Sequence, residues 1–475
     1  MKKKSLLEIL FSEASPDFGA SLKIASEMAR SVNLQGGKAV VVGGTVRDLT
    51  LKQSDPEIKL KDIDIEVFGI EKRKLRELLE RHGKVIEVGV SFSVFKLNGL
   101  DISLPRRDIK AGSGHKGFRI ETDQSMSFKE ASRRRSFTIN AMGLDFITGE
   151  LLDPWGGEAD IKNRILRVVD PETFVDDSLR VLRGMQFAGR LNLSIEKNTL
   201  TLCRSIDLDD LSEERIGEEW MKLLLLSHKP SIGLQAGMDM AVLEKLHPEL
   251  FGMAGVLQQS EWHPEGDVWE HTKLTVDAMA EIIRREQLEG EQAEILMLAS
   301  LLHDIGKPPT TELSEGFIHS YNHHIAGLEP AERFLLQIKR GKGIIKAVLP
   351  LIREHLFLTF VPEPGEKALR RLAVRLQPAT IRLLAYLIEA DLRGMKAKPE
   401  RIDRCSKLLD DALKLELAES MPKPILTGKM LILRGYQPGP VFGDILDEAY
   451  DAQLNGEFDS QEGAVIWLEE RFSRD

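Results

Sequence analysis

The sequence predicts an α/β head with a small mixed sheet, followed by an all-helical remainder. Three observations predict this fold class: the apolar run 39–42 that ends in a glycine pair, the alternating segment 85–97, and the helical pattern from Phe174 onward. Short apolar runs are typical of buried strands, and alternation of apolar and polar residues is typical of strands with one buried face. The first third of the chain is therefore expected to be mixed, and the rest α-helical.

Composition and charge are those of a globular enzyme. The chain has 475 residues, 42% hydrophobic and 29% charged, which corresponds to about three domains. A net charge of −10 argues against wholesale wrapping of nucleic acid but not against a local basic groove. Two cysteines, Cys203 and Cys405, cannot form a disulfide framework. The N-terminal lysines precede no long apolar run, so no signal peptide is expected. No stretch reaches the length of a membrane-spanning helix, and we expect a cytoplasmic protein.

Two carboxylates, Asp62 and Asp64, are the most informative feature of the head. On a strand, alternate side chains share a face, so a D-x-D pattern places the two carboxylates side by side. Adjacent carboxylates repel each other unless a cation lies between them. Oxygen ligands of this kind suit Mg²⁺, which also binds triphosphates.

A glycine pair and an Arg-Asp pair precede these carboxylates. Gly43 and Gly44 follow the apolar strand and let backbone N–H groups approach a phosphate closely. Arg47 is suited to bind a phosphate through two parallel N–H donors, and Asp48 is suited to orient the Arg47 guanidinium. This ordered combination indicates metal-dependent nucleotidyl transfer, with the two carboxylates as catalytic residues. It resembles the core of the polymerase-β-type nucleotidyltransferases, and more narrowly the class II tRNA nucleotidyltransferases and bacterial poly(A) polymerases.

The resemblance continues in the next strands. In the family an acidic residue followed by an Arg lies on the strand after the alternating segment, which here implies Asp101 and Arg106. A strand-end Asp that caps a turn is the alternative for Asp101. The glycine-rich segment 112–117 is similar to the flexible loop near the incoming nucleotide, and a plain mobile loop is the alternative.

An arginine cluster forms the second motif of the head. Residues 132–142 have the sequence S-R-R-R-S-F-T-I-N-A-M, which is similar to the family pattern R-R-D-F-T-I-N-A. The resemblance implies that Arg134 and Arg135 bind triphosphate oxygens and that Asn140 belongs to the site. Ser136 takes the place of the Asp that helps recognise the ribose, which leaves sugar selectivity open.

The next helical segment resembles the base-reading motif E-D-x-x-R. Residues 176–183 have the sequence D-D-S-L-R-V-L-R, which puts Asp177 and Arg180 on one helix face. The resemblance implies that this pair meets the Watson–Crick edge of CTP and ATP, whose exocyclic amine lies beside a ring acceptor. Arg183 is assigned to the same nucleotide site, and the helix around Arg215 is expected to support it. An intrahelical salt bridge is the alternative for the pair.

A second series of residues, beginning near residue 266, has the order H…HD…D. It resembles the HD superfamily of metal-dependent phosphohydrolases, because an adjacent His-Asp pair at a helix end is combined with a His and an Asp from separate helices. Imidazole and carboxylate suit a transition metal or Mg²⁺, which would activate water to attack phosphorus. A structural metal that only ties helices together is the alternative. The implied ligands are His271, His303, Asp304 and Asp391, with His323 and His355 as phosphate or second-metal contacts.

The predicted organisation is a helical extension at 1–30, a polymerase-β-like head at 31–155, a helical neck at 156–260, an HD domain at 261–400 and a helical tail at 401–475. The resemblance implies template-independent addition of C, C and A to tRNA from CTP and ATP, with Mg²⁺ in the head. Segment 88–97 is like that of the tRNA enzymes and lacks the basic-aromatic stretch of poly(A) polymerases. A CC-only or A-only enzyme, a poly(A) polymerase and a non-catalytic RNA- or nucleotide-binding protein remain alternatives, and the oligomeric state stays open.

Overall fold

The computed structural model describes residues 5–12, 16–56, 58–60, 62–88, 94–110 and 118–472. The chain forms two compact units. The first comprises Met1–Ile216 and Gln235–Leu246, and the second comprises Gly217–Leu234 and His247–Asp475. Among the residues described, none of the helices combines the length and apolar character that a membrane crossing requires.

A mixed sheet lies at the centre of the first unit. Within the described residues it has seven strands in the order β3-β4-β5-β2-β1-β8-β9. β2 and β5 run parallel, and the other neighbours run antiparallel. The strands are β1 Lys38–Val42, β2 Ile63–Phe68, β3 Ile86–Val88, β4 Val94–Leu97, β5 Leu100–Ser103, β8 Gly143–Asp145 and β9 Leu151–Leu152. The predicted mixed sheet is confirmed, and the alternating segment 85–97 contributes β3 and β4 to it, although residues 89–93 lie outside the described residues.

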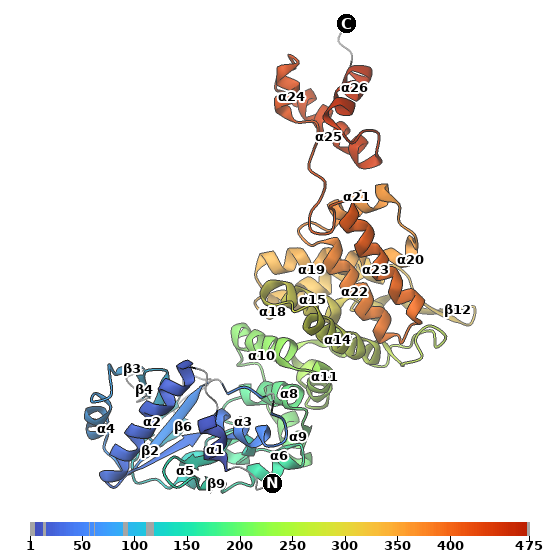
Figure 1. The fold of residues 1–475 in the computed structure, drawn as a ribbon. Coiled ribbons are helices and arrows are strands. Elements are labelled where there is room, and N and C mark those ends of the chain that lie inside the picture. Colours follow the sequence, from blue (N-terminus) through green and yellow to red (C-terminus); the bar gives the residue numbers. More distant parts are fainter. Residues whose placement is uncertain are drawn as a thin grey trace. The chain divides into compact units, whose positions relative to one another are not determined.

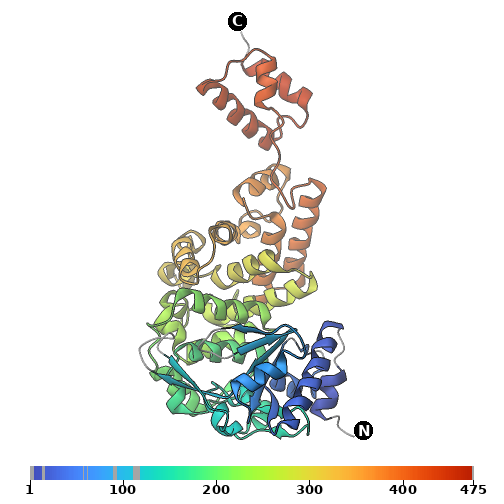
Figure 2. The same cartoon turned by 90° about the vertical axis from the view of Figure 1, so that its left-hand side faces the viewer.

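Helices cover the sheet because its central strands are apolar. Four of the five residues of β1 are buried, and α2 packs against this strand and against α4. Figure 2 shows the N-terminal helices, in dark blue, beside the strands. A separate ribbon of β6 and β7 follows, and the predicted nucleotide loop 112–117 between them lies outside the described residues. The elements are α1 Leu6–Ser12, α2 Pro16–Leu34, α3 Gly44–Lys52, α4 Lys72–Leu79, β6 Arg106–Lys110, β7 Phe118–Thr122 and α5 Phe128–Ser132.

The segment after the sheet is mainly helical, as expected, but residues 175–178 separate α7 from α8. The helical pattern from Phe174 onward is confirmed, but the expectation that Asp177 and Arg180 share one helix face is wrong, because α7 ends at Phe174 and α8 begins at Leu179. Asp177 Oδ1 accepts a hydrogen bond from the backbone N–H of Leu179 at 3.3 Å, and short polar side chains favour such caps over helix interiors. A short helix, η1 Thr138–Asn140, precedes β8. The elements after the sheet are α6 Gly157–Lys162, β10 Ile165–Leu166, α7 Pro171–Phe174, α8 Leu179–Leu191, β11 Ser194–Ile195, α9 Lys197–Ser205, α10 Glu213–Leu226, α11 Pro230–Asp239, α12 Val242–Leu246 and α13 Pro248–Phe251.

The second unit is built around α15, which is buried along most of its length. Residues 295–302 of this helix are all buried, and α14, α19 and α22 pack around it (Figure 1). A helix that is apolar on all sides must be enclosed in this way. From α14 onward its elements are α14 Val268–Arg285, α15 Gly290–Leu302, α16 Lys307–Thr310, β12 Thr311–Ser314, β13 Phe317–Ser320, α17 His323–Ala326, α18 Leu328–Gln337, α19 Lys342–Glu354, α20 Phe357–Phe360, α21 Glu366–Arg375, α22 Ile381–Gly394, α23 Pro399–Lys414, α24 Gly428–Leu433, α25 Pro440–Asn455 and α26 Gln461–Arg471.

Gly306 allows two segments of the second unit to approach closely. A Cβ at this position would lie 2.1 Å from the carbonyl oxygen of His323 and 2.5 Å from the amide nitrogen of Gly327. Both neighbours are backbone atoms, so a side chain cannot be accommodated by a change of rotamer. The turn after α15 therefore rests directly on α17.

We predict that Gly306→Ala lowers the free energy of unfolding by about 1–3 kcal/mol, the usual penalty for overpacking. The matched control is Gly343→Ala in α19, where the nearest atom to a new Cβ, Glu291 Oε1, is 3.9 Å away. Urea unfolding followed by circular dichroism measures both. Equal stability of the two variants would show that the turn can shift without strain.

Candidate functional sites

Three acidic side chains gather along β2 and β5. Asp62 is exposed and directly precedes β2, and Asp64 is half-buried within it. Asp64 is the register partner of Asp101 in the parallel pairing, and Asp101 Oδ1 lies 3.0 Å from Lys96 Nζ. Burial and the charges of Asp101 and Asp62 raise the pKa of Asp64, although Arg135 opposes them. The turn-cap alternative for Asp101 is wrong because this residue lies inside a strand. The crowded negative charge suits a divalent cation.

The glycine turn after β1 lies directly beside these carboxylates. Gly43 has φ 71° and ψ −131°, a conformation that side chains rarely adopt. A Cβ on Gly43 would lie 2.9 Å from Arg135 Nη1 and 3.8 Å from Asp64 Oδ2. Thr45 Oγ1 donates to the carbonyl oxygen of Asp62 at 2.7 Å. The turn and the start of β2 are therefore held together.

Arg47 links α3 to the segment that carries the arginine motif. Its Nε donates to Asp48 Oδ1 at 2.7 Å, and its Nη1 donates to Asn140 Oδ1 at 2.9 Å. Only 8% of the Arg47 side chain is exposed, and Gly44 leaves room for its guanidinium. The structure thus brings these four predicted residues together, with Arg47 fixed mainly by internal hydrogen bonds.

A buried carboxylate that sequence reasoning missed anchors the arginine cluster. Glu66 on β2 has a fully buried side chain and accepts from Arg134 Nη2 at 2.9 Å. Its other oxygen lies 3.9 Å from Arg135 Nη2. Burial lowers the pKa of Arg135 to about 10, the charge of Glu66 opposes this, and Arg134 and Arg106 add to the lowering. The alternation Asp62-x-Asp64-x-Glu66 was a usable signal, because it puts all three acids on one face of the strand.

The proposed base-reading pair is held by separate partners. Arg180, which is buried, donates to the carbonyl oxygens of Thr173 at 2.6 Å and Arg134 at 3.0 Å. Asp177 lies before α8 and accepts from Arg215 Nη2 at 2.9 Å. The expectation that the helix around Arg215 supports this pair agrees with this contact, which the sequence alone did not reveal.

Two other residues of these motifs occupy more open positions. Ser136 is half-buried, and its backbone carbonyl accepts from the amide of Val169 at 3.2 Å. Arg183 is exposed on α8, one turn beyond Arg180. Both positions belong to the unit that holds the carboxylates.

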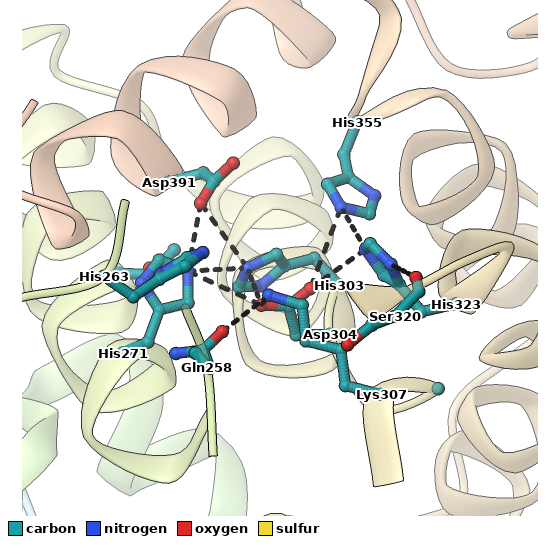
Figure 3. Close-up of polar contacts among 12 residues, drawn as sticks. Gln258, His263, His271, His303, Asp304, Lys307, Ser320, His323, His355 and Asp391 are labelled. Carbon is teal, nitrogen blue, oxygen red and sulfur yellow. Dashed lines mark hydrogen bonds and ion pairs between the residues drawn. The ribbon is translucent and has the colours of Figure 1, made fainter. Parts of the chain in front are cut away.

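The second unit gathers four histidines and two aspartates, and Figure 3 shows them converging from several elements. All six were predicted from the sequence, and the structure brings all of them together. His271 comes from α14, His303 and Asp304 from the end of α15, His323 from α17, His355 from the end of α19, and Asp391 from α22.

The first group within this cluster contains two imidazoles and two carboxylates. His271 Nε2 lies 3.2 Å from His303 Nε2 and 3.0 Å from Asp391 Oδ1. Asp304 Oδ2 lies 3.2 Å from His303 Nε2 and 3.5 Å from His271 Nε2. Donor atoms of His271, His303 and Asp304 converge closely enough to coordinate one divalent ion, and Asp391 Oδ1 lies 3.8 Å from His303 Nε2.

The second group shares Asp304. Its other oxygen, Oδ1, lies 3.2 Å from His323 Nε2 and 3.9 Å from His355 Nε2. The two imidazole Nε2 atoms are 3.3 Å apart. Asp304 thus bridges two sets of donors, which is the arrangement of a site with two adjacent metal positions.

Hydrogen bonds at Nδ1 aim each imidazole at the centre of the cluster. Because Nδ1–H donates outward, Nε2 is left as an acceptor that faces the other donors. The acceptors are Glu265 Oε1 for His271, at 2.9 Å, and the carbonyl oxygens of Ser300 for His303, at 2.9 Å, of Ser320 for His323, at 2.7 Å, and of Ile352 for His355, at 2.7 Å. The rings are therefore oriented as metal ligands.

The electrostatics of the cluster also fit a divalent cation. Burial lowers the pKa of His355 to about 3, with the charges of His323 and His303 adding to it. At His271, hydrogen bonds to Asp391 and Glu265 outweigh burial and raise the pKa to about 9. At Asp391, the hydrogen bond to His271 and the charges of His271 and His303 outweigh burial and hold the pKa below the usual range. The carboxylates thus favour positive charge around His271, whereas His355 stays neutral and keeps its Nε2 lone pair for a ligand.

Sequence reasoning missed four residues around the cluster. Glu265, whose side chain is fully buried, accepts from His263 Nδ1 at 2.8 Å as well as from His271. These hydrogen bonds outweigh burial and lower the pKa of Glu265 to about 2. Lys307 Nζ lies 2.8 Å from Asp304 Oδ2 and donates to Gln258 Oε1 at 2.7 Å. Lys307 follows the His-Asp pair closely in sequence, whereas Glu265 and Gln258 carried no comparable signal.

Two family models match the chain. The poly A polymerase head domain matches residues 39–167, and the HD domain matches residues 268–416. The multifunctional CCA protein of Xanthomonas campestris pv. campestris (strain B100) is 33% identical over 376 residues, which cover 76% of this chain and 87% of that protein. The multifunctional CCA protein of Stenotrophomonas maltophilia (strain K279a) is 33% identical over 370 residues, covering 75% and 86%.

Solved structures share the fold over nearly the whole chain. A CCA-adding enzyme in an apo form is similar with a TM-score of 0.64 and 19% identity, covering 98% of this chain and 99% of that one. A complex of a CCA-adding enzyme with CTP has a TM-score of 0.63 at 20% identity and covers 100% of both chains. The Thermotoga maritima CCA-adding enzyme complexed with tRNA has a TM-score of 0.61 at 20% identity, covering 98% of both. The predicted fold class is confirmed.

We predict that Glu66→Ala lowers the free energy of unfolding of the first unit by about 3–5 kcal/mol, because it leaves Arg134 and Arg135 without their buried counter-charge. The matched control is Glu77→Ala, which removes the exposed pair between Arg73 Nε and Glu77 Oε1 at 3.1 Å and should cost less than about 1 kcal/mol. Urea denaturation of both variants provides the comparison. A loss at Glu66 no larger than at Glu77 would contradict the anchoring role.

Proposed function

Since this chain belongs to the family of multifunctional CCA proteins, we propose that it adds C, C and A to the 3′ end of tRNA from CTP and ATP. The observation that carries this proposal is the position of Asp62 and Asp64 beside the turn at Gly43. A CC-only or A-only enzyme and a poly(A) polymerase remain alternatives, which sequencing of the product distinguishes. Long A-tails on generic RNA would refute the tRNA assignment. The cytoplasm remains our prediction for its location.

The proposed reaction joins the RNA to the α-phosphate of the nucleotide. The 3′-hydroxyl oxygen of the RNA bonds to the α-phosphorus, the bond from that phosphorus to the bridging oxygen breaks, and pyrophosphate leaves while the hydroxyl proton is released. Asp62 and Asp64 would hold Mg²⁺, which supplies charge neutralisation for the triphosphate and lowers the pKa of the attacking hydroxyl. The remaining charge on the triphosphate is assigned to the arginine cluster.

Arg134 and Arg135 are proposed to bind the triphosphate oxygens. Both guanidinium groups are mostly buried, with 19% and 17% of the side chains exposed, and Glu66 offsets only part of their charge. Arg47 and Arg106 are proposed to add positive charge beside Arg134 and Arg135. Asn140 and Asp48 orient Arg47 through hydrogen bonds. Groups fixed in this way need little reorganisation when the substrate binds.

Asp177 and Arg180 are proposed to select the base. Arg215 fixes the carboxylate of Asp177, and two backbone carbonyls fix the guanidinium of Arg180. A fixed acceptor and a fixed donor suit the exocyclic amine and the ring acceptor that cytosine and adenine share. Arg183 on the same helix is proposed to contact the nucleotide from its exposed position. Rigid recognition of one shared pattern accounts for the use of both CTP and ATP.

We also propose that the second unit is a phosphohydrolase that acts on 2′,3′-cyclic and terminal phosphates of RNA. His271, His303, Asp304 and Asp391 would hold a divalent metal, which supplies Lewis acidity at the phosphate and lowers the pKa of a water molecule. His323 and His355, with Asp304 shared, are proposed to hold a second ion or the phosphate itself.

The proposed hydrolysis would free the 3′-hydroxyl that nucleotidyl transfer in the first unit requires. The water oxygen bonds to phosphorus, the bond to a ribose oxygen breaks, and that oxygen takes a proton. Lys307 lies beside Asp304 and lines the same cavity, so it is placed to bind the phosphate. Nucleotidyl transfer needs a free 3′-hydroxyl, which a cyclic or terminal phosphate blocks. Removal of that phosphate would restore a substrate for CCA addition.

We predict that Asp62→Ala and Asp64→Ala each abolish incorporation of radiolabelled CTP and ATP into tRNA that lacks CCA, because the cation between the carboxylates is lost. Circular dichroism and melting temperature should stay unchanged. The control is Asp209→Ala, which removes an exposed carboxylate from the same unit. Incorporation near the wild-type rate in either variant would contradict the assignment.

We predict that the double variant His303→Ala/Asp304→Ala loses hydrolysis of a nucleoside 2′,3′-cyclic phosphate and retains CTP incorporation. The reason is that it removes two of the four proposed metal ligands and leaves the first unit intact. His228→Ala, at an exposed histidine of the second unit, is the control. Persistent hydrolysis would contradict the site, and loss of incorporation without a change in melting would contradict two independent activities.

A further inference from the structure

A ladder of three aromatic rings projects from the β12–β13 hairpin. Phe317 and His319 lie on β13, and Tyr321 follows directly after it. The ring centroids are 6.3 Å apart between Phe317 and His319, with an interplanar angle of 29°, and 5.0 Å apart between His319 and Tyr321, with an angle of 14°. The rings stack because alternate residues of an extended segment share a face.

The ladder exposes a large area of flat apolar surface. Phe317 is 52% exposed and Tyr321 is 74% exposed, and nearby Trp262 is 58% exposed. Exposed aromatic groups clustered in this way mark a binding surface more often than single exposed residues do. The proposed metal chemistry does not use these rings, so their exposure on the surface needs a separate explanation.

The ladder and the histidine cluster line one cavity. Its volume is about 510 Å³, which is within the range for small-molecule sites. Phe317, His319 and Tyr321 line it together with the cluster residues Asp304 and Asp391. A ligand in this cavity therefore meets flat rings and the site of phosphate chemistry at the same time.

The polar lining of the cavity is also suited to a nucleotide. Lys307 and Arg401 contribute positive charge, and Gln259 and Asn322 contribute amide groups. Among the residues that the structure describes, the Arg401 guanidinium forms no ion pair, which leaves it available for a phosphate. A nucleotide is the class of ligand that combines a flat ring with phosphate, and stacking on aromatic rings tolerates every base.

We propose that the aromatic ladder binds the terminal nucleobase of an RNA 3′ end whose cyclic or terminal phosphate lies at the histidine cluster. This subsite rests on the proposed phosphohydrolase function and specifies its substrate class. The ladder supplies affinity and orientation, and it takes no part in the bond-breaking step. It lets the site accept RNA ends of any sequence.

The test compares a nucleoside 2′,3′-cyclic phosphate with methyl riboside 2′,3′-cyclic phosphate, which has no base. In Phe317→Ala/Tyr321→Ala, KM for the nucleotide should rise about tenfold to hundredfold, since stacking is worth about that factor per base. The value of kcat and the KM for the base-free substrate should change less than about threefold.

Tyr321→Phe, which keeps the ring, should behave as wild type. Leu313→Ala is the control, because Leu313 is 74% exposed on the same hairpin and does not line the cavity.

A binding measurement separates failure of the subsite from failure of the phosphohydrolase. Calorimetry with a nucleoside 3′-monophosphate should show weaker binding to the double variant than to wild type, whatever the hydrolytic rate. If wild type does not hydrolyse the cyclic substrate but the double variant still binds the nucleotide more weakly than wild type, the phosphohydrolase proposal is contradicted and the base-binding subsite is supported. Equal nucleotide binding by both proteins, or an equal rise in KM for both substrates, would overturn the subsite. If the double variant melts at a lower temperature, the single variant Tyr321→Ala replaces it in each comparison.

Discussion

The side chain of Glu66 is fully buried, and the guanidinium of Arg134, 2.9 Å away, supplies the charge that keeps this carboxylate compatible with the interior. A buried carboxylate without such a partner costs several kcal/mol. The ion pair fixes the arginine segment against β2, the strand that also carries Asp64. Arg180 in turn donates to the carbonyl of Arg134. This buried pair therefore connects the carboxylates, the arginines and the start of α8.

Asp304 has the corresponding role in the second unit. Its two oxygens face different pairs of histidines, and Lys307 compensates part of its charge. His303 and His355 each lie at the C-terminal end of a helix and donate to the carbonyl three residues earlier. The last carbonyls of a helix have no partner within the helix, so the helix ends themselves supply the acceptors that orient the rings. The donor set is thus fixed by backbone geometry.

Local patterns were sufficient to predict much of the fold and most of the candidate residues. The D-x-D spacing placed Asp62 and Asp64 on one face because the period of a strand is two, and the structure has Asp64 within β2 and Asp62 directly before it. The adjacent His303 and Asp304 lie at a helix end, as predicted. The same reasoning failed at residues 175–178, where Asp177 and Ser178 interrupt the expected helix. There a local side-chain cap competes with helical hydrogen bonding, and periodicity does not reveal it.

By itself, the sequence determined the residue types, their order and the faces of individual strands and helices, since these depend on neighbours a few positions away. The family resemblance, now supported by relatives over most of the chain, rests on the same motifs. Only the tertiary structure decided the pairings between distant segments: Glu66 with Arg134, Asp177 with Arg215, and His271 with Glu265 and Asp391. It also decided that the aromatic rings of the β12–β13 hairpin line the same cavity as the histidine cluster. Such contacts depend on how whole elements pack, because the packing that buries apolar surface sets which charges must meet.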